Sequence, residues 1–255
     1  MHLPPLSRVP ALVAVTGLLA GGVTGALAGG ALADEGGPRP LPDVAVRYDT
    51  EHVVADLADA LRAVDTYRFE LRLDPQAPVV TGGAERHGDR WDLVGRIDED
   101  GAVSELRLVD DAAYASLPGL TDGFARTSRD EPADMLVGAY VDYLAVVDLP
   151  RRFEEIRDAV ASVAPGGASI TADGVTAQPF DVVVDLRRAT GATGERFTSG
   201  AVSNPYWMLR LWIGPDGLVR RYAEPAGSVE ADLTGWNTDV QIDPPADFTE
   251  LTPRT

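Results

Sequence analysis

Residue types that carry out covalent chemistry are scarce in this 255-residue chain. It has no cysteine, and all 22 basic residues are arginines, which excludes thiol catalysis, thiolate metal sites, Schiff-base chemistry and a P-loop lysine. Beyond the N-terminal segment the only histidines are His52 and His87, and no G-x-S-x-G motif is present. A Ser-His-Asp triad or a histidine-based metal site therefore has almost nothing to use, and we predict no catalytic residue.

One acidic segment is spaced like a calcium-binding loop. Asp98, Asp100 and Gly101 fit that pattern, but Arg96 stands where the first ligand belongs and Arg107 where the closing glutamate is required. Asp-Gly is also the strongest short signal for a hairpin turn. The same dipeptide recurs at Asp173-Gly174 and Asp216-Gly217. We therefore predict three hairpin turns, no metal site and no cofactor.

The charge of the chain limits its partners. With 40 acidic against 22 basic residues, the formal net charge is −18. A field of this sign repels nucleic acid and anionic lipid surfaces, so we expect no nucleic-acid partner. With so many carboxylates, some pairs lie close by chance, and proximity alone does not indicate glycosidase chemistry.

The first 33 residues have the pattern of an export signal. A short basic start precedes an apolar stretch rich in Ala and Gly, and Ala31-Leu32-Ala33 offers the small residues that a signal peptidase accepts. Because the apolar stretch is long enough to span a bilayer, an uncleaved N-terminal anchor, and with it membrane association, stays open as an alternative. Either reading places the protein outside the cytoplasm. The Pro- and Gly-rich segment 34–46 is typical of a tether.

Hydrophobic periodicity predicts one helix followed by a strand meander. Apolar residues recur at helical spacing over 50–67, and strict alternation follows over 67–74. Further strands are expected over 78–86, 91–98 and 103–110. Tight turns between them favour an antiparallel sheet with one dry and one wet face.

The second half of the chain is predicted to hold two helices and more strands. A capping box at 128–131 precedes an apolar run over 135–147, and a second helix is expected over 148–163. Strands are expected at five further places: 168–172, 179–186, 210–222 as a hairpin, 228–236 and 240–245. The small-residue segment 188–206 is expected to be a mobile loop.

These elements predict an α+β fold for residues 47–250. About eight strands would form a single antiparallel sheet with one apolar face, covered by about three helices. Many inward-facing helix residues are small, which suggests an unfilled apolar space between the helices and the sheet. A well-packed core of Val and Ala is the competing interpretation, and both stay open on the sequence alone.

The order of the motifs resembles the actinobacterial lipoproteins of the LppX and LprG type. The resemblance rests on four segments: AYASLPGL (113–120), TADGVTAQPFDVVVDL (171–186), LWIGPDGLVRRY (211–222) and LTGWNTDVQIDPP (233–245). It implies a curved half-barrel sheet, like that of the LolA and LolB carriers, with helices packed on its concave face. It also implies a hydrophobic cavity that binds and carries a lipid or glycolipid. Unlike that family, this chain has no lipobox cysteine.

We therefore expect a carrier of hydrophobic molecules and no enzyme. The alternative is an envelope sensor or protein-interaction domain on the same fold. The candidate cavity-lining residues are Leu57, Leu61, Phe69, Leu71, Leu93, Leu144, Leu209 and Leu211. The segment 188–206, which has no counterpart in the resemblance, is a candidate flap at the cavity mouth.

Overall fold

The computed structural model describes residues 52–88, 90–199, 204–224 and 229–251. The predicted export signal at 1–33 and the tether at 34–46 lie outside these ranges. The helical elements are α1 (Val53–Leu61), α2 (Met135–Leu144), the short 3-10 helix η2 (Ala145–Val147), α3 (Leu149–Ile156) and α4 (Gly191–Thr198). None of the helices in the described ranges is both long and apolar enough to span a membrane.

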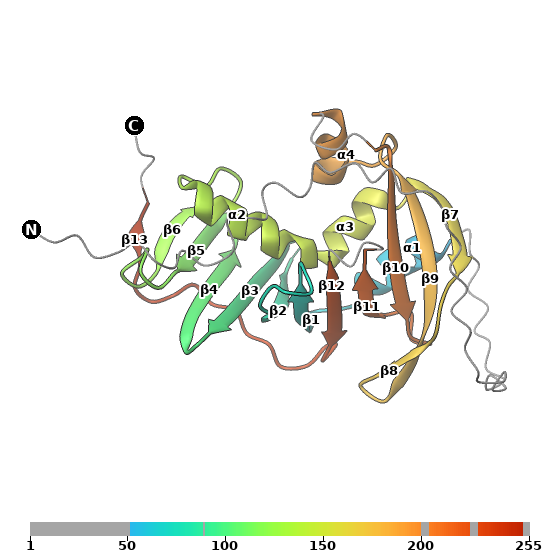
Figure 1. Cartoon of the computed structure of the whole chain (residues 1–255), viewed down its shortest axis with the longest axis horizontal. Helices are drawn as coiled ribbons and strands as arrows, with labels where there is room; N and C mark the ends of the chain where they lie inside the picture. Colours follow the sequence, from blue (N-terminus) through green and yellow to red (C-terminus); the bar gives the residue numbers. More distant parts are fainter. Residues whose placement is uncertain (1–51, 89, 200–203, 225–228, 252–255) are drawn as a thin grey trace, which may run out of the picture.

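The strands form one open, curved sheet (Figure 1). Their bounds are β1 (Thr66–Arg72), β2 (Val80–His87), β3 (Arg90–Glu99), β4 (Ala102–Val109), β5 (Ala112–Ser116), β6 (Ala125–Ser128), β7 (Val160–Pro165), β8 (Ile170–Ala172), β9 (Val175–Asp185), β10 (Tyr206–Ile213), β11 (Val219–Ala223), β12 (Glu230–Thr234) and β13 (Thr249–Glu250). The order across the sheet is β13-β6-β5-β4-β3-β2-β1-β12-β11-β10-β9-β7, and β8 pairs with β9. Apart from the parallel β13–β6 pair, neighbours in the described sheet are antiparallel. The predicted α+β class with a curved antiparallel sheet is confirmed.

Alternation along the strands sends apolar side chains to the concave face. In β1, Tyr67, Phe69 and Leu71 are buried while the residues between them are exposed, as expected for a strand with one covered face. Helices α2 and α3 lie along that concave face (Figure 1), and α2 contacts β3, β4 and β5. The main core thus lies between the concave face and the helices.

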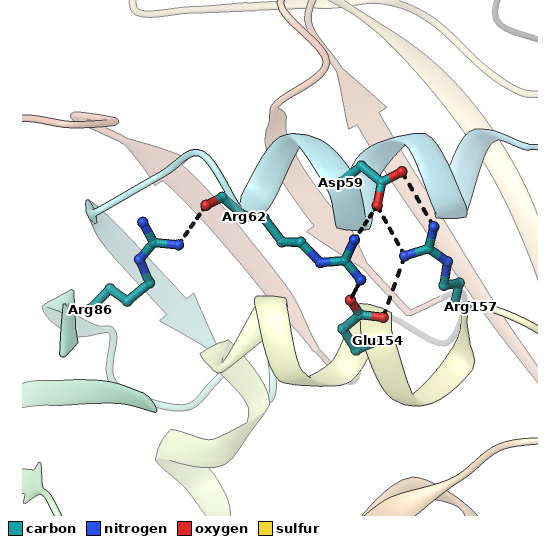
Figure 2. A network of polar contacts seen from close by, with 5 residues as sticks. All are labelled: Asp59, Arg62, Arg86, Glu154 and Arg157. Carbon is teal, nitrogen blue, oxygen red and sulfur yellow. Dashed lines mark hydrogen bonds and ion pairs between the residues drawn. The ribbon is translucent and has the colours of Figure 1, made fainter. Parts of the chain in front are cut away.

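A network of four charged side chains joins α1 to α3 (Figure 2). Asp59 accepts hydrogen bonds from Arg62 and Arg157, and Glu154 pairs with the same two arginines. By contrast, α2 contains a single charged residue, Asp142, which is exposed. Helix α2 is therefore held to the sheet chiefly by apolar contacts.

The convex face of β2–β5 is covered by the segment 239–248, which we call the strap. Ile242 of the strap packs with Val109, Ala112 and Tyr114 in a second, smaller core. The backbone N–H of Ile242 also donates to the Glu85 carboxylate, with 2.6 Å between N and Oε2. The predicted strand over 240–245 is wrong, because this segment forms no strand and is held by side-chain bonds instead.

The second predicted helix, over 148–163, is correct only as far as Ile156. From Val160 the chain becomes β7, which pairs with β9. The apolar spacing fits a helix, but the β-branched valines pair along an otherwise open sheet edge, and tertiary pairing prevails over local periodicity. The predicted capping box at 128–131 begins no helix: the amide of Glu131 donates to the Ser128 hydroxyl at 3.2 Å, but Ser128 ends β6. Helix α2 is capped instead by Asp134, whose Oδ1 accepts from the amides of Leu136 and Val137.

The segment 188–206 was expected to be a loop but contains helix α4. The carboxylate of Glu155 in α3 accepts hydrogen bonds from the amides of Ala192 and Thr193, at 3.2 and 3.0 Å, and so caps the first turn of α4. Helix α4 is thereby docked on α3 (Figure 1).

Candidate functional site

On the concave face, β2 and β3 place two glycines side by side, so neither strand has a side chain at this position. Gly82 and Gly95 are cross-strand partners, flanked in the same row by Phe69 of β1 and Leu106 of β4. Two adjacent glycines leave a depression in the surface of the sheet. We call the row of Gly82 and Gly95 the trough.

The protein's own side chains fill the trough. The ring of Phe69 comes within 2.4 Å of the position that a Cβ atom on Gly82 would occupy, and Cδ1 of Leu144 comes within 2.6 Å of the corresponding position on Gly95. Real Cβ atoms do not approach other atoms this closely, so a side chain at Gly95 would require Leu144 to move, and one at Gly82 would also meet the backbone carbonyl of Val94 at 2.0 Å. Phe69 and Leu144 thus take up the space that the missing side chains leave.

Next to the trough lies a hollow between α2 and the strands β2, β3 and β4. It is partly open to solvent, and its free volume for a water-sized sphere is only about 10 Å³, far below the roughly 300–1,000 Å³ typical of small-molecule pockets. Its lining residues are Val80, Gly95, Ile97, Ser104, Glu105, Leu106, Tyr140, Tyr143 and Leu144. The described residues are therefore closed over this site, and the hollow between them is too small for a lipid.

The ionisable groups at the hollow are held away from neutral titration. Burial by itself would raise the pKa of Glu105, but hydrogen bonds from Arg107 and Arg96, each at 2.6 Å, hold it below its usual value. Burial raises the pKa of Tyr143 to about 12 and also raises that of Tyr140. None of these three groups is suited to proton transfer near pH 7.

All eight predicted cavity residues are buried, but only two lie at this site. Leu144 lines the hollow and Phe69 covers Gly82. The remaining residues belong to the packed main core: Leu57 and Leu61 of α1, Leu71 of β1, Leu93 of β3, and Leu209 and Leu211 of β10. Their contact with a ligand stays a prediction.

Sequence reasoning missed the two glycines that shape the trough. The signal was present, because Gly82 and Gly95 each interrupt a predicted strand, and glycine inside a strand often marks a close approach of other atoms. The pairing of the two glycines could not be predicted without the register of β2 on β3.

The Asp-Gly segments form turns, as predicted. Asp100 and Gly101 both have positive φ, at 55° and 83°, and Asp173 and Gly174 repeat this at 49° and 73°, the conformation of the tightest hairpin turns. Within the described ranges, no group of three or more His, Cys, Asp or Glu side chains is arranged to hold a metal ion.

Comparisons with known proteins find similarity in structure but not in sequence. No protein-family model matches the chain, and no curated protein matches it. Among solved structures it is similar to LprF from Mycobacterium bovis, with 14% identity and a TM-score of 0.51 over 76% of this chain and 96% of LprF. It is more distantly similar to a chain of the MucA/MucB complex of Pseudomonas aeruginosa, with 15% identity and a TM-score of 0.39 over 75% of this chain and 56% of that one. The likeness to LprF shows a shared fold: an open, curved sheet with helices on its concave face.

Proposed function

We propose that the protein binds and carries a lipid or another hydrophobic molecule outside the cytoplasm, in the space between α2 and the concave face of the sheet. The observation that carries this proposal is the contact of Leu144 with Gly95. An apolar helix there covers a row of the sheet that has no side chains of its own. The fold shared with LprF and the order of the sequence motifs support the same function.

A ligand would have to displace α2 from the sheet. We call residues 130–147, which contain α2 and η2, the lid. Its buried aliphatic side chains in α2 are Val137, Val141 and Leu144. Exposing them costs about 1.5–3 kcal/mol each, roughly 5–9 kcal/mol together. Burying an acyl chain of about twelve methylene groups offsets this, at about 0.8 kcal/mol per group. The proposed ligand therefore has a long alkyl chain.

As part of this proposal, we expect that the protein is not an enzyme. A carrier needs no nucleophile or general base, and the pKa of each shifted group lining the hollow is moved away from neutrality. An envelope sensor on the same fold stays a prediction, since no observation in the structure favours it over carriage.

The substitution Leu144→Ala tests the proposal. It would remove the side chain that fills the trough, so the free energy of unfolding should fall by about 2–5 kcal/mol. At the same time the affinity for a fluorescent fatty-acid probe should increase, because a competing group has been removed. Leu186→Ala is the matched control: this leucine is also buried in the main core but is not a predicted cavity residue, and its loss should lower stability without improving probe binding.

Native mass spectrometry of protein purified from its own host gives the second measurement. We expect a bound species of lipid mass that organic extraction removes. The proposal is wrong if neither the wild-type protein nor Leu144→Ala takes up the probe and no lipid co-purifies.

A further inference from the structure

The two ends of the lid are joined by an ion pair. Arg129 follows directly after β6, and Asp148 directly precedes α3. Nη2 of Arg129 lies 3.5 Å from Oδ2 of Asp148. Everything between these residues is the lid, so the pair closes its base. Asp148 is also the residue at which the chain leaves the helical conformation between η2 and α3, with φ −74° and ψ 67°, which makes it a natural hinge.

The Asp148 carboxylate is deeply buried and poorly satisfied. The residue is 4% exposed, and its Oδ1 atom has no hydrogen-bond partner in the described structure. Its side chain does not cap α3. Arg129 does not direct both of its terminal nitrogens at Asp148, because Nη1 donates to the backbone carbonyl of Trp91 at 3.1 Å. Among the described residues, one long contact at 3.5 Å is therefore the only ion pair that compensates this carboxylate within 4 Å.

Four ionisable groups face Asp148 from the surrounding elements. Arg129 lies at the end of β6, Arg151 and Glu155 lie on α3, and Tyr67 lies on β1 with its hydroxyl donating to the carbonyl of Val147. Burial raises the pKa of Asp148, against the opposing effects of the Arg129 charge, the Arg151 charge and the backbone N–H of Arg151, while Glu155 adds to the rise. Desolvation of this carboxylate thus outweighs its attraction to the arginines, as is common for buried pairs with incomplete hydrogen bonding.

We propose that Asp148 is a proton-controlled latch for the lid, which closes over the trough when the carboxyl is protonated and opens when it is ionised. This regulation rests on the proposed function, because the trough is the site where the ligand would bind. Uptake of the hydrophobic molecule would be favoured at neutral pH, and release in a more acidic compartment or microenvironment.

The sign follows from proton linkage. In the open state Asp148 is in water, with the ordinary pKa of an aspartate, about 3.9. In the closed state the pKa is raised, so the closed state binds more protons. Opening therefore becomes more favourable as pH increases from the ordinary value up to the raised one, by about tenfold for each unit between them. Above the raised value, and below the ordinary one, the closed-to-open ratio does not change with pH.

A cysteine reporter measures lid opening without any ligand. The chain has no cysteine, so Val141→Cys introduces a single thiol on the buried face of α2. Its labelling rate is taken relative to a free thiol at each pH, which removes the titration of the thiol itself. We expect the relative rate to rise with pH from the ordinary pKa of Asp148 to the raised one and to level off above the raised value.

Substitutions in the Val141→Cys background assign the effect to Asp148. With Asp148→Asn, which imitates the protonated carboxyl, the relative rate should be low and independent of pH. Asp142→Asn is the matched control: it removes one negative charge from α2 at an exposed position and should leave the pH dependence unchanged. Faster labelling of Asp148→Asn at neutral pH, or a pH dependence that survives this substitution, would overturn the latch.

Arg129→Gln in the same background gives an independent test, in which the labelling rate should change in the opposite direction to that of Asp148→Asn. It leaves an ionised, buried Asp148 without its partner, so labelling at neutral pH should be faster than in the parent, and an unchanged or slower rate contradicts the proposal. Titration with the fatty-acid probe then separates the two proposals. A pH-dependent lid in a protein that binds no probe retains the latch and refutes the carrier function.

Discussion

Leu144 of α2 lies directly over Gly95 of β3, with its Cδ1 atom 2.6 Å from where a Cβ atom of that glycine would be. Because the two residues are 49 positions apart in the chain, the contact defines how the helix sits on the sheet. It is also the contact that a ligand in the trough would have to replace. Gly95 therefore determines how closely the lid packs on the sheet, as well as the shape of the sheet itself.

Gly95→Ala should lift α2 locally without unfolding the protein. The added methyl group meets the end of a leucine side chain, which can rotate toward the adjoining hollow. We expect a loss of about 1–3 kcal/mol in the free energy of unfolding, measured by urea denaturation, as is usual for one extra methyl in a packed core. Gly82→Ala should cost more, because its methyl would lie 2.0 Å from the backbone carbonyl of Val94, which cannot move without breaking the ladder.

Gly138→Ala on α2 is the control for these two substitutions. A Cβ atom there has only ordinary contacts with Pro132, at 3.5 and 3.6 Å. Replacing glycine by alanine in a helix should stabilise the protein by up to about 1 kcal/mol. If Gly95→Ala were as favourable as Gly138→Ala, the close seat of Leu144 on the sheet would be refuted.

The strap should contribute substantially to stability although it contains little regular structure. Ile242 is 4% exposed and completes the smaller core on the convex face. Truncating it to alanine should lower the free energy of unfolding by about 2–4 kcal/mol. Gln241→Ala, at the exposed neighbouring position, should change it by less than about 0.5 kcal/mol. Equal, small effects at both positions would mean that the strap does not pack on the sheet in solution.

The docking of α4 should depend on the ionisation of Glu155. Burial alone would raise the pKa of this carboxyl, but hydrogen bonds from Thr193 and Arg151 outweigh burial and hold the pKa below its usual 4.5. A lowered pKa means that the stabilisation is fully present above 4.5 and is lost as pH falls through the lowered value. Hydrogen exchange over 191–198 should therefore accelerate in acid relative to the intrinsic amide rate.

Glu155→Gln should give the same acceleration at neutral pH, because the capping charge is gone. Glu154→Gln is the matched control, since Glu154 pairs with Arg62 and Arg157 (Figure 2). Exchange in α4 that is identical in both variants would show that Glu155 does not dock it.

Local patterns in the sequence predicted the strands better than the contacts between elements. The alternation in β1 and β9 predicted both the strand and its buried face, because a one-sided sheet enforces a period of two. Residues 157–163 were misassigned because Val160 and Val163 fit both periods, and the free edge of β9 decided between them. Helix α4 was missed because its cap, Glu155, comes from another helix and leaves no local signal.

At the candidate site, too, local patterns were predictable and contacts between elements were not. Inward-facing leucines and Phe69 could be predicted from alternation, and all are buried. That Leu144 and Phe69, rather than empty space, occupy the trough depends on the register of three strands and the height of α2 above them. Residue sizes alone suggested a space but could not show what filled it.

Arg220 carries an incompletely satisfied guanidinium within the sheet. It is the extra residue of a bulge between β10 and β11, where Trp212 pairs with Arg221 and Ile213 with Val219. Arg220 is 4% exposed, and its Nε and Nη1 atoms are buried without a hydrogen-bond partner in the described structure. Only Nη2 is bonded, to the carboxylate of Asp216, whose side chain is 44% exposed.

Replacing Arg220 by methionine should therefore leave the free energy of unfolding unchanged or increase it. The substitution removes two unpaired buried donors and keeps the apolar stem, and a buried charge replaced by an apolar group of similar volume is often neutral or stabilising. Asp216 loses its partner at little cost, because its side chain is half in water. Asp216→Ala should act in the opposite direction and cost about 1–3 kcal/mol, since it leaves the buried guanidinium with no partner.

The neighbouring Arg221→Met variant separates this effect from a general loss of positive charge. Arg221 is bonded through Nε and Nη2 to Asp232, at 2.6 and 3.0 Å, so methionine there removes a satisfied pair and should cost up to about 1 kcal/mol. Urea denaturation of the three variants should rank them with Arg220→Met the most stable. A loss of more than about 2 kcal/mol in Arg220→Met would mean that the guanidinium is fully hydrogen-bonded in solution, and that this bulge exists to hold it.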